Sequence, residues 1–250
     1  MKETDYSQIA LRYDKNRLRH DIARDENIEK LYITNSSRLR VLDLACGTGN
    51  YIKNQIQEYG NHVISWVGID KSPEMLKMAY EKNIRVKFIL GDACQIPLQD
   101  RAIDYVKIRF AFHHFSDKEK VITEVRRILS NNGAVSIQNL SHDYMKYSWV
   151  YKYFPGAESI DRDRFPSTLD IHNLLIKYGF ETTVNIQTTI RRFAYKDIIE
   201  EVENRDMSQL NLISEDTYRT GLDAMKQDAE RVDYLVGDIS FLDIYAEKST

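Results

Sequence analysis

Chemically distinct side chains stand at the ends of four successive apolar runs in this sequence. The first run contains Asp43 and leads into a turn of small residues, the second ends in Asp70, the third in Asp92, and the fourth in Arg109. A carboxylate accepts hydrogen bonds and suits ribose hydroxyls or an exocyclic amine. Each acid alone is common at strand ends and helix caps. Their joint placement, one at each successive strand end, predicts a ligand site.

The turn after the first run, residues 45–49, is followed by a helical pattern. Gly47 and Gly49 can adopt positive φ and carry no Cβ, so the backbone there can approach a ligand closely. The helix beyond them presents free N–H groups and a partial positive charge. A purely structural turn would use the same glycines. The turn therefore indicates a ligand site only in combination with the acids at the strand ends.

The distance from the turn to the second acid raises a nicotinamide-dependent oxidoreductase as an alternative. Asp70 lies 21 residues beyond Gly49, near the spacing of about 20 at which an acid binds a ribose in dinucleotide folds. The fingerprint G-x-G-x-x-G lacks its third glycine, because Ile52 stands there, and the sequence has no GxxxxGK[ST] loop. We therefore expect a nucleoside ligand that is not a phosphate ester.

The composition is that of an ordinary globular protein. The 250 residues are 42% hydrophobic and 29% charged, enough for one large domain with a proper core. A formal net charge of −3 gives no electrostatic case for nucleic acid binding. The polar N-terminus lacks the apolar region of a signal peptide, and no run approaches the ~18 residues of a membrane helix. Cys46 and Cys94 show neither CxxC nor zinc spacing, so we expect a cytoplasmic protein without disulfides, metal or membrane contact.

Strand and helix patterns alternate along the chain. Residues 4–32 are predicted to be helical, Ser72-Pro73-Glu74 begins a helix, 116–119 fits a capping box, and 131–133 is a stop signal. A later helix ends at Gly179. The predicted strands are 39–44, 63–70, 86–90, 103–108, 134–139, 181–193 and 239–247. The fold class is therefore α/β, a doubly wound, mostly parallel seven-stranded sheet of Rossmann-like type with helical cap insertions.

Several motifs together resemble one known family. Residues 41–50 look like motif I of the class I S-adenosylmethionine-dependent methyltransferases, and 67–76, 91–93, 112–115 and 127–133 agree with the same family. The likeness covers roughly residues 6–140. It is closest in character to the small-molecule branch similar to the ubiquinone/menaquinone C-methyltransferases. Two positions depart from the usual pattern: Ala45 replaces the first glycine of the loop, and Asn132 replaces one glycine of the pair before the fifth strand.

The resemblance implies S-adenosyl-L-methionine as the cofactor and a role for each matched residue. The backbone of Ala45, Gly47 and Gly49 would hold the methionine part, with Asp43 ordering the loop from beneath. Asp70 would bind the ribose. The remaining implied contacts are Lys71, Met75, Asp92 and Ala93 at the adenine, Arg109 or Phe110 at the methionine part through backbone, and Tyr6 and Tyr13 closing over the cofactor.

The resemblance also implies how the chain is organised. We expect a single methyltransferase domain over 1–250, in which 1–37 forms an N-terminal helical cover. Insertions at 141–166 and 195–236 would form an acceptor lid. The many aromatic residues of 141–166 fit a planar or apolar acceptor, and an ordinary packed helix predicts the same residues.

The implied reaction is methyl transfer to a small-molecule acceptor at oxygen, nitrogen or carbon by in-line displacement. A general base is needed only when the nucleophile arrives protonated. The candidates are His114, His142 and Tyr13, although a histidine at these positions also serves packing. The alternative function is a catalytically silent protein that binds S-adenosylmethionine or regulates a partner. The sequence specifies no oligomeric state.

Overall fold

The computed structural model describes residue 14 and residues 22–34, 38–60 and 64–249. These residues divide into two compact units. The sheet unit comprises the described residues of 6–139, together with His172–Val184 and 243–249. The aromatic unit comprises Leu140–Ile171 and Asn185–Leu242. The predicted insertions 141–166 and 195–236 both lie in the aromatic unit.

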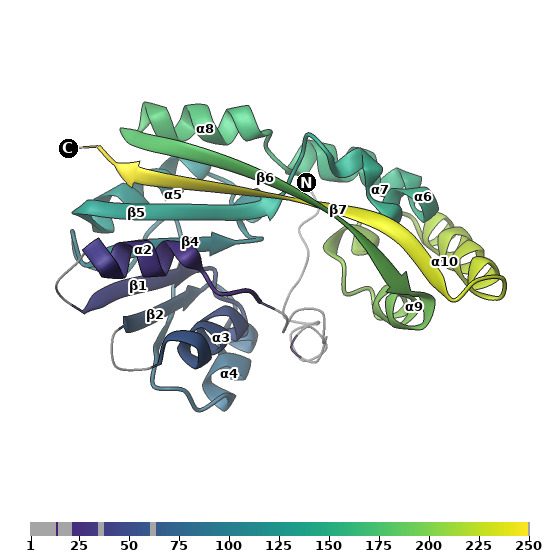
Figure 1. Cartoon of the computed structure of the whole chain (residues 1–250), viewed down its shortest axis with the longest axis horizontal. Coiled ribbons are helices and arrows are strands. Elements are labelled where there is room, and N and C mark those ends of the chain that lie inside the picture. Colours follow the sequence, from purple (N-terminus) through teal and green to yellow (C-terminus); the bar gives the residue numbers. More distant parts are fainter. Residues whose placement is uncertain (1–13, 15–21, 35–37, 61–63, 250) are drawn as a thin grey trace. The chain divides into compact units, whose positions relative to one another are not determined.

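Seven strands form one sheet, in the order β3-β2-β1-β4-β5-β7-β6 (Figure 1). Their bounds are β1 Leu39–Leu44, β2 Ile64–Asp70, β3 Lys87–Leu90, β4 Ile103–Arg109, β5 Leu129–Leu140, β6 Phe180–Ala194 and β7 Tyr234–Lys248. The pairs β1–β2, β1–β4, β2–β3 and β4–β5 are parallel. Strand β7 runs opposite to β5 and β6 in Figure 1. The predicted mostly parallel seven-stranded sheet is therefore confirmed.

Helices connect and extend these strands. The α-helices are α2 Glu26–Thr34, α3 Asn50–Tyr59, α4 Pro73–Glu81, α5 Lys118–Ile128, α6 Trp149–Tyr153, α7 Pro155–Arg164, α8 Thr168–Lys177, α9 Tyr195–Glu203 and α10 Glu215–Ala229. Short 3-10 helices are η3 Phe112–His114, η4 Met145–Tyr147 and η5 Ser208–Asn211. Within this described part of the chain, no helix is long and apolar enough to cross a membrane.

Local signals in the sequence account for several helix boundaries. The Ser72 hydroxyl caps α4 by accepting a hydrogen bond from the Met75 N–H at 3.2 Å, and Pro73 occupies the first turn. Gly179 follows α8 with a φ of 72°, the left-handed conformation that favours glycine. These two boundaries lie where the sequence predicts them.

The predicted helix over 4–32 is wrong at residues 22–25 and confirmed at 26–32. Residues 22–25 are not helical, and α2 begins only at Glu26. Asp25 stops the helix from extending backwards because its carboxylate accepts from the Asn27 N–H at 3.1 Å and its carbonyl accepts from the Ile28 N–H at 3.0 Å. Most of 4–21 lies outside the described residues.

The boundary around the fifth strand also differs from the prediction. The cap of α5 is Asp117, whose carboxylate accepts from the Lys120 N–H at 2.9 Å, and not Ser116. Residues 131–133 do not end the helix, because β5 starts at Leu129 directly after it. A Cβ on Gly133 would lie 2.9 Å from the Leu129 side chain, so this glycine permits a close approach within an irregular strand.

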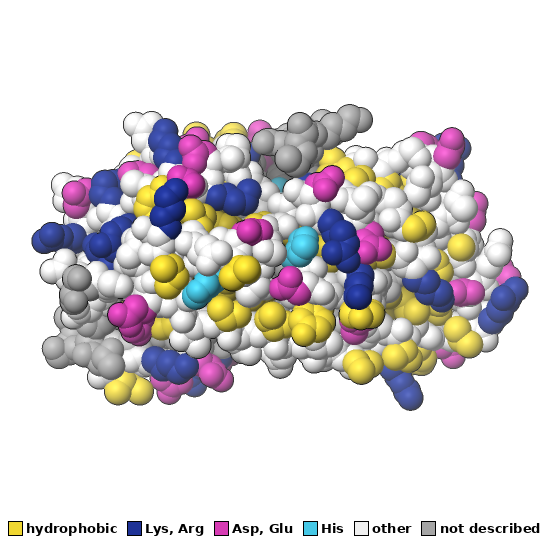
Figure 2. All heavy atoms as spheres, turned by 90° about the horizontal axis from the view of Figure 1, so that it is seen from above, with side chains coloured by type: hydrophobic (Ala, Val, Ile, Leu, Met, Phe, Trp, Pro, Cys, Tyr) yellow, Lys and Arg dark blue, Asp and Glu magenta, His cyan; other side chains and the backbone are white. Residues whose placement is uncertain are grey.

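Both faces of the sheet are buried in the sheet unit. On β1, Leu39 and Val41 belong to a core cluster with residues of α2 and α3, while Leu42 and Leu44, which point to the opposite face, are also buried. Parallel strands buried on both faces are typical of a sheet covered by helices. Lys, Arg, Asp and Glu side chains intermingle on the surface shown in Figure 2.

The aromatic unit has a core of its own. Trp149, Tyr151 and Tyr153 are 6–7% exposed and pack with residues of α9 and α10. Tyr144 and Tyr147 are exposed at 45% and 58%. Among the aromatic residues of 141–166, packing therefore accounts for Trp149, Tyr151 and Tyr153, while Tyr144 and Tyr147 lie at the surface.

Candidate functional site

Four strand ends meet at one edge of the sheet unit. In the parallel register, Leu44 pairs with Ile69, Asp70 with Leu90, and Asp43 with Lys107. Because parallel strands end at the same edge, the loops after β1, β2, β3 and β4 are neighbours there. The sequence predicts its cofactor site from residues of these same four ends.

The glycine loop, residues 45–49, is made of left-handed backbone. Ala45, Gly47 and Gly49 have φ values of 62°, 53° and 74°. The Cys46 N–H donates to the Ile69 carbonyl at 3.0 Å, which joins the loop to β2, and the Gly49 N–H donates to the Cys46 carbonyl at 2.9 Å. Ala45 thus adopts a conformation that costs a non-glycine residue about 1 kcal/mol. The substitution of the usual glycine is tolerated with strain.

Close packing explains why the loop needs its last glycine. A Cβ on Gly49 would lie 3.1 Å from the Phe88 ring and 3.2 Å from Ala79. At Gly47 the nearest atom would be the Met75 sulfur at 3.9 Å, so this residue leaves ordinary space beside a buried thioether. Gly49 is therefore fixed by helix–strand packing, and Gly47 by its backbone conformation.

Asp70 joins the glycine loop to the start of α4. Its Oδ2 accepts from the Gly47 N–H at 2.7 Å, and its Oδ1 accepts from the Ser72 N–H at 2.9 Å. Burial raises the pKa of Asp70, and the N–H groups of Ser72 and Gly47 oppose that rise. A carboxylate offers about four acceptor positions, and backbone N–H groups of Gly47, Ser72 and Lys71 use part of that capacity. A carboxylate held in this way at a strand end is suited to accept from a ribose hydroxyl as well.

The loop after β3 presents the next acid. Asp92 is exposed, and its Oδ1 accepts from the Cys94 N–H at 2.8 Å. Ala93 beside it is buried at 8%, as is Met75 on α4 at 3%. Lys71 is exposed directly after β2. A free carboxylate oxygen beside small and apolar side chains is suited to a flat ring that carries an amine.

Strained backbone also marks the end of β4. Phe110 has a φ of 52°, uncommon for a bulky residue, and its N–H donates to the Gln138 carbonyl at 2.8 Å. Arg109 donates from Nε to the Gln138 side-chain oxygen at 3.0 Å, and its guanidinium lies 4.7 Å from the Phe110 ring centre. Gln138 on β5 therefore holds both residues in place.

Known proteins match this chain over the same region. Residues 41–133 match the family model described as a methyltransferase domain. The chain is 37% identical over 101 residues to a demethylmenaquinone methyltransferase of Thermotoga maritima, covering 40% of this chain and 43% of that protein. It is 30% identical over 185 residues to phosphoethanolamine N-methyltransferase 2 of Caenorhabditis elegans, covering 72% of this chain and 40% of that protein. The solved YcgJ protein of Bacillus subtilis superposes with a TM-score of 0.59 at 20% identity, over 90% of this chain and 99% of that one.

Residues 41–133 therefore match the methyltransferase domain family, and the chain is similar to class I S-adenosylmethionine-dependent methyltransferases. It spans less than half the length of the two sequence relatives above, 43% and 40%. The solved structure shares the methyltransferase fold. The cofactor of the family fits the residues present, because the Asp70 carboxylate is an acceptor suited to ribose hydroxyls and Gly47 and Gly49 leave the loop backbone open to close approach.

Asp43 is an acid of the candidate site with a strongly raised pKa. Its side chain is 2% exposed on β1, directly before the glycine loop. Burial raises the pKa of Asp43 to about 7; the positive charges of Arg109 and Lys107 lower it, and the charge of Asp70 raises it. The pKa of Asp43 therefore lies close to neutral pH, directly before the glycine loop.

The candidate catalytic residues of the methyltransferase are dispersed. His114 is half-buried in η3 after β4, and its ring centre lies 3.9 Å from that of His113. His142 belongs to the aromatic unit, where its Nδ1 is 3.7 Å from the Asp143 carboxylate. Tyr6 and Tyr13 lie outside the described residues. Only His114 is described within the unit that carries the cofactor candidates.

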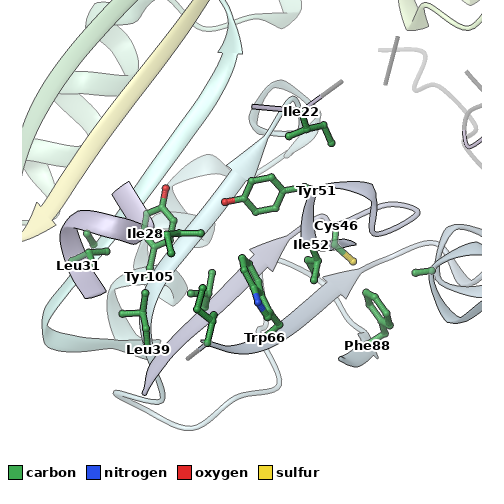
Figure 3. Close-up of a cluster of buried hydrophobic side chains, with 14 of the residues drawn as sticks. Ile22, Ile28, Leu31, Leu39, Cys46, Tyr51, Ile52, Trp66, Phe88 and Tyr105 are labelled. Atoms are coloured by element: carbon green, nitrogen blue, oxygen red, sulfur yellow. The ribbon is translucent and has the colours of Figure 1, made fainter. Parts of the chain in front are cut away.

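Sequence reasoning missed three residues that contact or support the candidate site. A Cβ on Gly68 of β2 would lie 2.6 Å from Phe88 and 3.0 Å from the Cys46 sulfur; Figure 3 shows both side chains. Gln138 and Lys107 were missed as well. All three interrupt an apolar strand pattern, Gly68 by its small size and Lys107 and Gln138 by their polarity. Such an interruption is the sequence feature by which they could have been identified.

Proposed function

We propose that this protein transfers a methyl group from S-adenosyl-L-methionine to a small-molecule acceptor. The observation that carries the proposal is the Asp70 carboxylate, which bridges the glycine loop and the start of α4 at the strand end where a ribose would lie. Asp92 on the next strand end supports it, because an adenine amine needs an acceptor. Family membership over residues 41–133 supports it independently.

Each residue has a distinct task in this proposal. The glycine loop and Asp43 hold the amino-acid part of the cofactor, Asp70 its ribose, and Asp92, Ala93, Lys71 and Met75 its adenine. Bound cofactor supplies a methyl group on a sulfonium, which leaves as a neutral thioether when the acceptor's electron pair forms the new bond to carbon. The protein contributes chiefly alignment of the acceptor with the carbon–sulfur bond and exclusion of water.

Proton removal, where the acceptor needs it, is assigned to His114. It follows β4 within the unit that holds the cofactor residues, and imidazole titrates near neutrality. A His114→Ala variant then loses the acidic limb of its pH–rate profile while its affinity for S-adenosylhomocysteine stays within about twofold. A profile unchanged from the parent removes His114 as the base.

The aromatic unit is proposed to bind the acceptor. It contains both insertions and two exposed tyrosines, Tyr144 and Tyr147. One relative is named for demethylmenaquinone and another for phosphoethanolamine, so apolar quinones and phosphorylated amines are the first acceptors to compare. The mixed charges in Figure 2 support a small acceptor over a nucleic acid.

Titration calorimetry with S-adenosylhomocysteine tests the cofactor assignment, with NAD as the competing ligand. We expect binding of the first and none of the second; the reverse result restores a nicotinamide enzyme. Transfer of labelled methyl from the cofactor to the two acceptor classes then separates an enzyme from a protein that only binds. A protein that binds the cofactor and methylates neither class contradicts the proposed acceptors.

A further inference from the structure

A hollow lined by basic side chains lies in the sheet unit, at the edge opposite the glycine loop. It has a volume of about 610 Å³, and its lining includes Arg101, Arg126, Arg127 and Lys248. Arg101 precedes β4, the other two arginines lie in the last turn of α5, and Lys248 ends β7. The hollow lies where the paired strands β4 and β5 start, whereas the cofactor candidates follow the ends of the parallel strands. The two places are therefore separate.

Hydrogen bonds hold two of these cations at the hollow. The Lys248 ammonium donates to the carbonyls of Arg126 at 3.1 Å and Leu129 at 3.0 Å, so the end of β7 caps α5 where β5 starts (Figure 1). Arg126 donates from Nη1 to the Gly179 carbonyl at 2.8 Å, and its guanidinium lies 5.9 Å from the Phe180 ring centre. Contacts within the protein therefore position both cations.

Arg101 adds an exposed cation on strained backbone. Its φ of 56° is uncommon for a residue other than glycine. The Arg101 N–H donates to the Arg127 carbonyl at 3.1 Å, and its own carbonyl accepts from Nη1 of Arg40 at 3.2 Å. Neighbouring segments thus hold this conformation in place, and backbone strain maintained in this way is most frequent at binding sites.

The positive charge of the hollow is only partly compensated. Arg127 pairs with Glu124 at 2.7 Å and with Asp100 at 2.8 Å. The other three lining cations pair with no carboxylate in the part of the chain that the structure describes. Burial lowers the pKa of Lys248, and the positive charges of two nearby arginines lower it further. Three cations therefore converge without a counter-charge in a chain whose formal net charge is −3.

We propose that this basic hollow binds a small phosphorylated anion, apart from the cofactor site. A guanidinium forms paired hydrogen bonds to phosphate oxygens, and several converging cations match the charge of a phosphate, which approaches −2. The volume is in the range of small-molecule sites. None of the described lining residues is aromatic, so a nucleobase would find no stacking surface. The ligand is therefore a diphosphate or a phosphate ester with a small polar body.

A bound anion would join segments that are distant in the sequence. Arg101, the end of α5 and Lys248 lie on three separate segments and would share one ligand. Because the hollow exists only when these segments are folded together, the anion binds the native state and raises the midpoint of thermal unfolding. This inference does not depend on the proposed function.

Titration calorimetry and thermal unfolding of the full chain test the site, with pyrophosphate and glycerol 3-phosphate as probes at an ionic strength held constant with potassium chloride. We expect saturable binding and a raised unfolding midpoint in the parent. Arg101→Gln removes the exposed cation but none of the contacts that cap α5, and should weaken binding by at least about tenfold, the effect of losing one charged hydrogen bond. Arg85→Gln, at an exposed arginine of the same unit outside the hollow, is the matched control and keeps the parent's affinity within about twofold.

A second variant places a negative charge in the hollow. Thr123 is an exposed lining residue on α5, and Thr123→Glu should abolish binding of both probes while the unfolding midpoint without anion stays near that of the parent. Tighter binding of pyrophosphate supports a free diphosphate as the ligand, and tighter binding of glycerol 3-phosphate supports an ester. A parent that binds neither probe saturably, or binds a single-stranded oligonucleotide in their place, overturns the inference. Equal affinity of Arg101→Gln and the parent overturns it as well.

Discussion

Two buried carboxylates, one in each unit, have different surroundings. In the aromatic unit, the Asp161 carboxylate accepts from Tyr151 at 2.8 Å and pairs with Arg164 at 2.5 Å, so side chains of that core satisfy it. In the sheet unit, the Asp70 carboxylate lies beside the glycine loop and accepts from the backbone N–H groups of Gly47 and Ser72. Pairing with core side chains indicates a stability role, whereas an acid that orders strained backbone at a strand end indicates a binding role.

The largest expected effect is a loss of stability when Asp161 in the aromatic unit is replaced. Asp161→Ala leaves the Arg164 guanidinium buried without its carboxylate, which we expect to destabilise the protein by about 3–5 kcal/mol. Affinity for S-adenosylhomocysteine at a temperature where the variant is folded should stay that of the parent. Thermal unfolding and calorimetry measure the two quantities, and Asp161→Asn, which keeps an acceptor for Tyr151, is the milder control. Lost affinity at unchanged stability would reverse the assignment of the two units.

Substitution of Asp43 in the sheet unit should stabilise the protein, whereas substitution of Asp161 should destabilise it. Its folded pKa of about 7 lies above an unfolded value near 3.9, so the folded state binds more protons between these values and its stability falls as pH rises through them. Asp43→Asn removes this cost and should stabilise the ligand-free protein by up to about 4 kcal/mol above pH 7. Denaturant unfolding at pH 5 and pH 8 measures the difference, which should be small at the lower pH. Loss of stability at both would contradict the buried-charge interpretation.

Substitutions at two glycines test how tightly the aromatic unit is packed. A Cβ on Gly221 of α10 would lie 2.4 Å from the Phe154 ring, so Gly221→Ala should cost about 1–3 kcal/mol in unfolding free energy. On Gly156 of α7 the nearest atom is 3.7 Å away, and Gly156→Ala should be neutral or slightly stabilising. Equal effects of the two substitutions would show that this core can relax.

Removing Asp70 tests the binding side directly. Asp70→Ala deletes the acceptor for Gly47 and Ser72 and for the proposed ribose, and should weaken S-adenosylhomocysteine binding by about 1–3 kcal/mol. Asp228→Ala, which removes the acceptor of Tyr153 in the aromatic unit, is the control and should leave the affinity unchanged. Calorimetry at one pH suffices, and a dissociation constant unaffected by Asp70→Ala excludes its role.

The smallest effect concerns backbone strain in the loop. Ala45 adopts a φ of 62°, and Ala45→Gly should relieve about 0.5–1 kcal/mol of unfavourable backbone energy, partly offset by the flexibility of glycine in the unfolded chain. Chemical unfolding measures it. A destabilised variant would mean that the Ala45 methyl packs usefully in the folded state.

Local chemistry made much of the fold predictable. Ser72 with Pro73 marks a helix start, and Gly179 a helix stop, whatever the rest of the chain does. Runs such as β1 and β4 are apolar because a parallel sheet is buried on both faces. The strand ends, and with them Asp43, Asp70 and Asp92, follow from that pattern.

Contacts between distant segments could not be predicted in this way. Lys107 and Asp25 contact each other only after the sheet forms, so no local pattern links them. Gly133 carries a stop signal for α5, yet close packing against Leu129 draws it into β5. The 22–25 segment lost its predicted helix for the same reason, since the Asp25 backbone N–H donates to Gln55 at 2.8 Å. Tertiary contacts overrode local preference at each of these sites.

The sheet unit can be completed only late during synthesis on the ribosome, because strand β7 is near the end of the chain. Ser136 and Asp243 are hydrogen-bonded across 107 positions, and Asp243 is the second carboxylate beside Lys107. Contacts that close such long loops form slowly, and a growing chain cannot make this one until β7 has emerged. Until then Lys107 has only half of its counter-charge, so a nascent or truncated chain that stops before Asp243 should be an early target for chaperones and proteases.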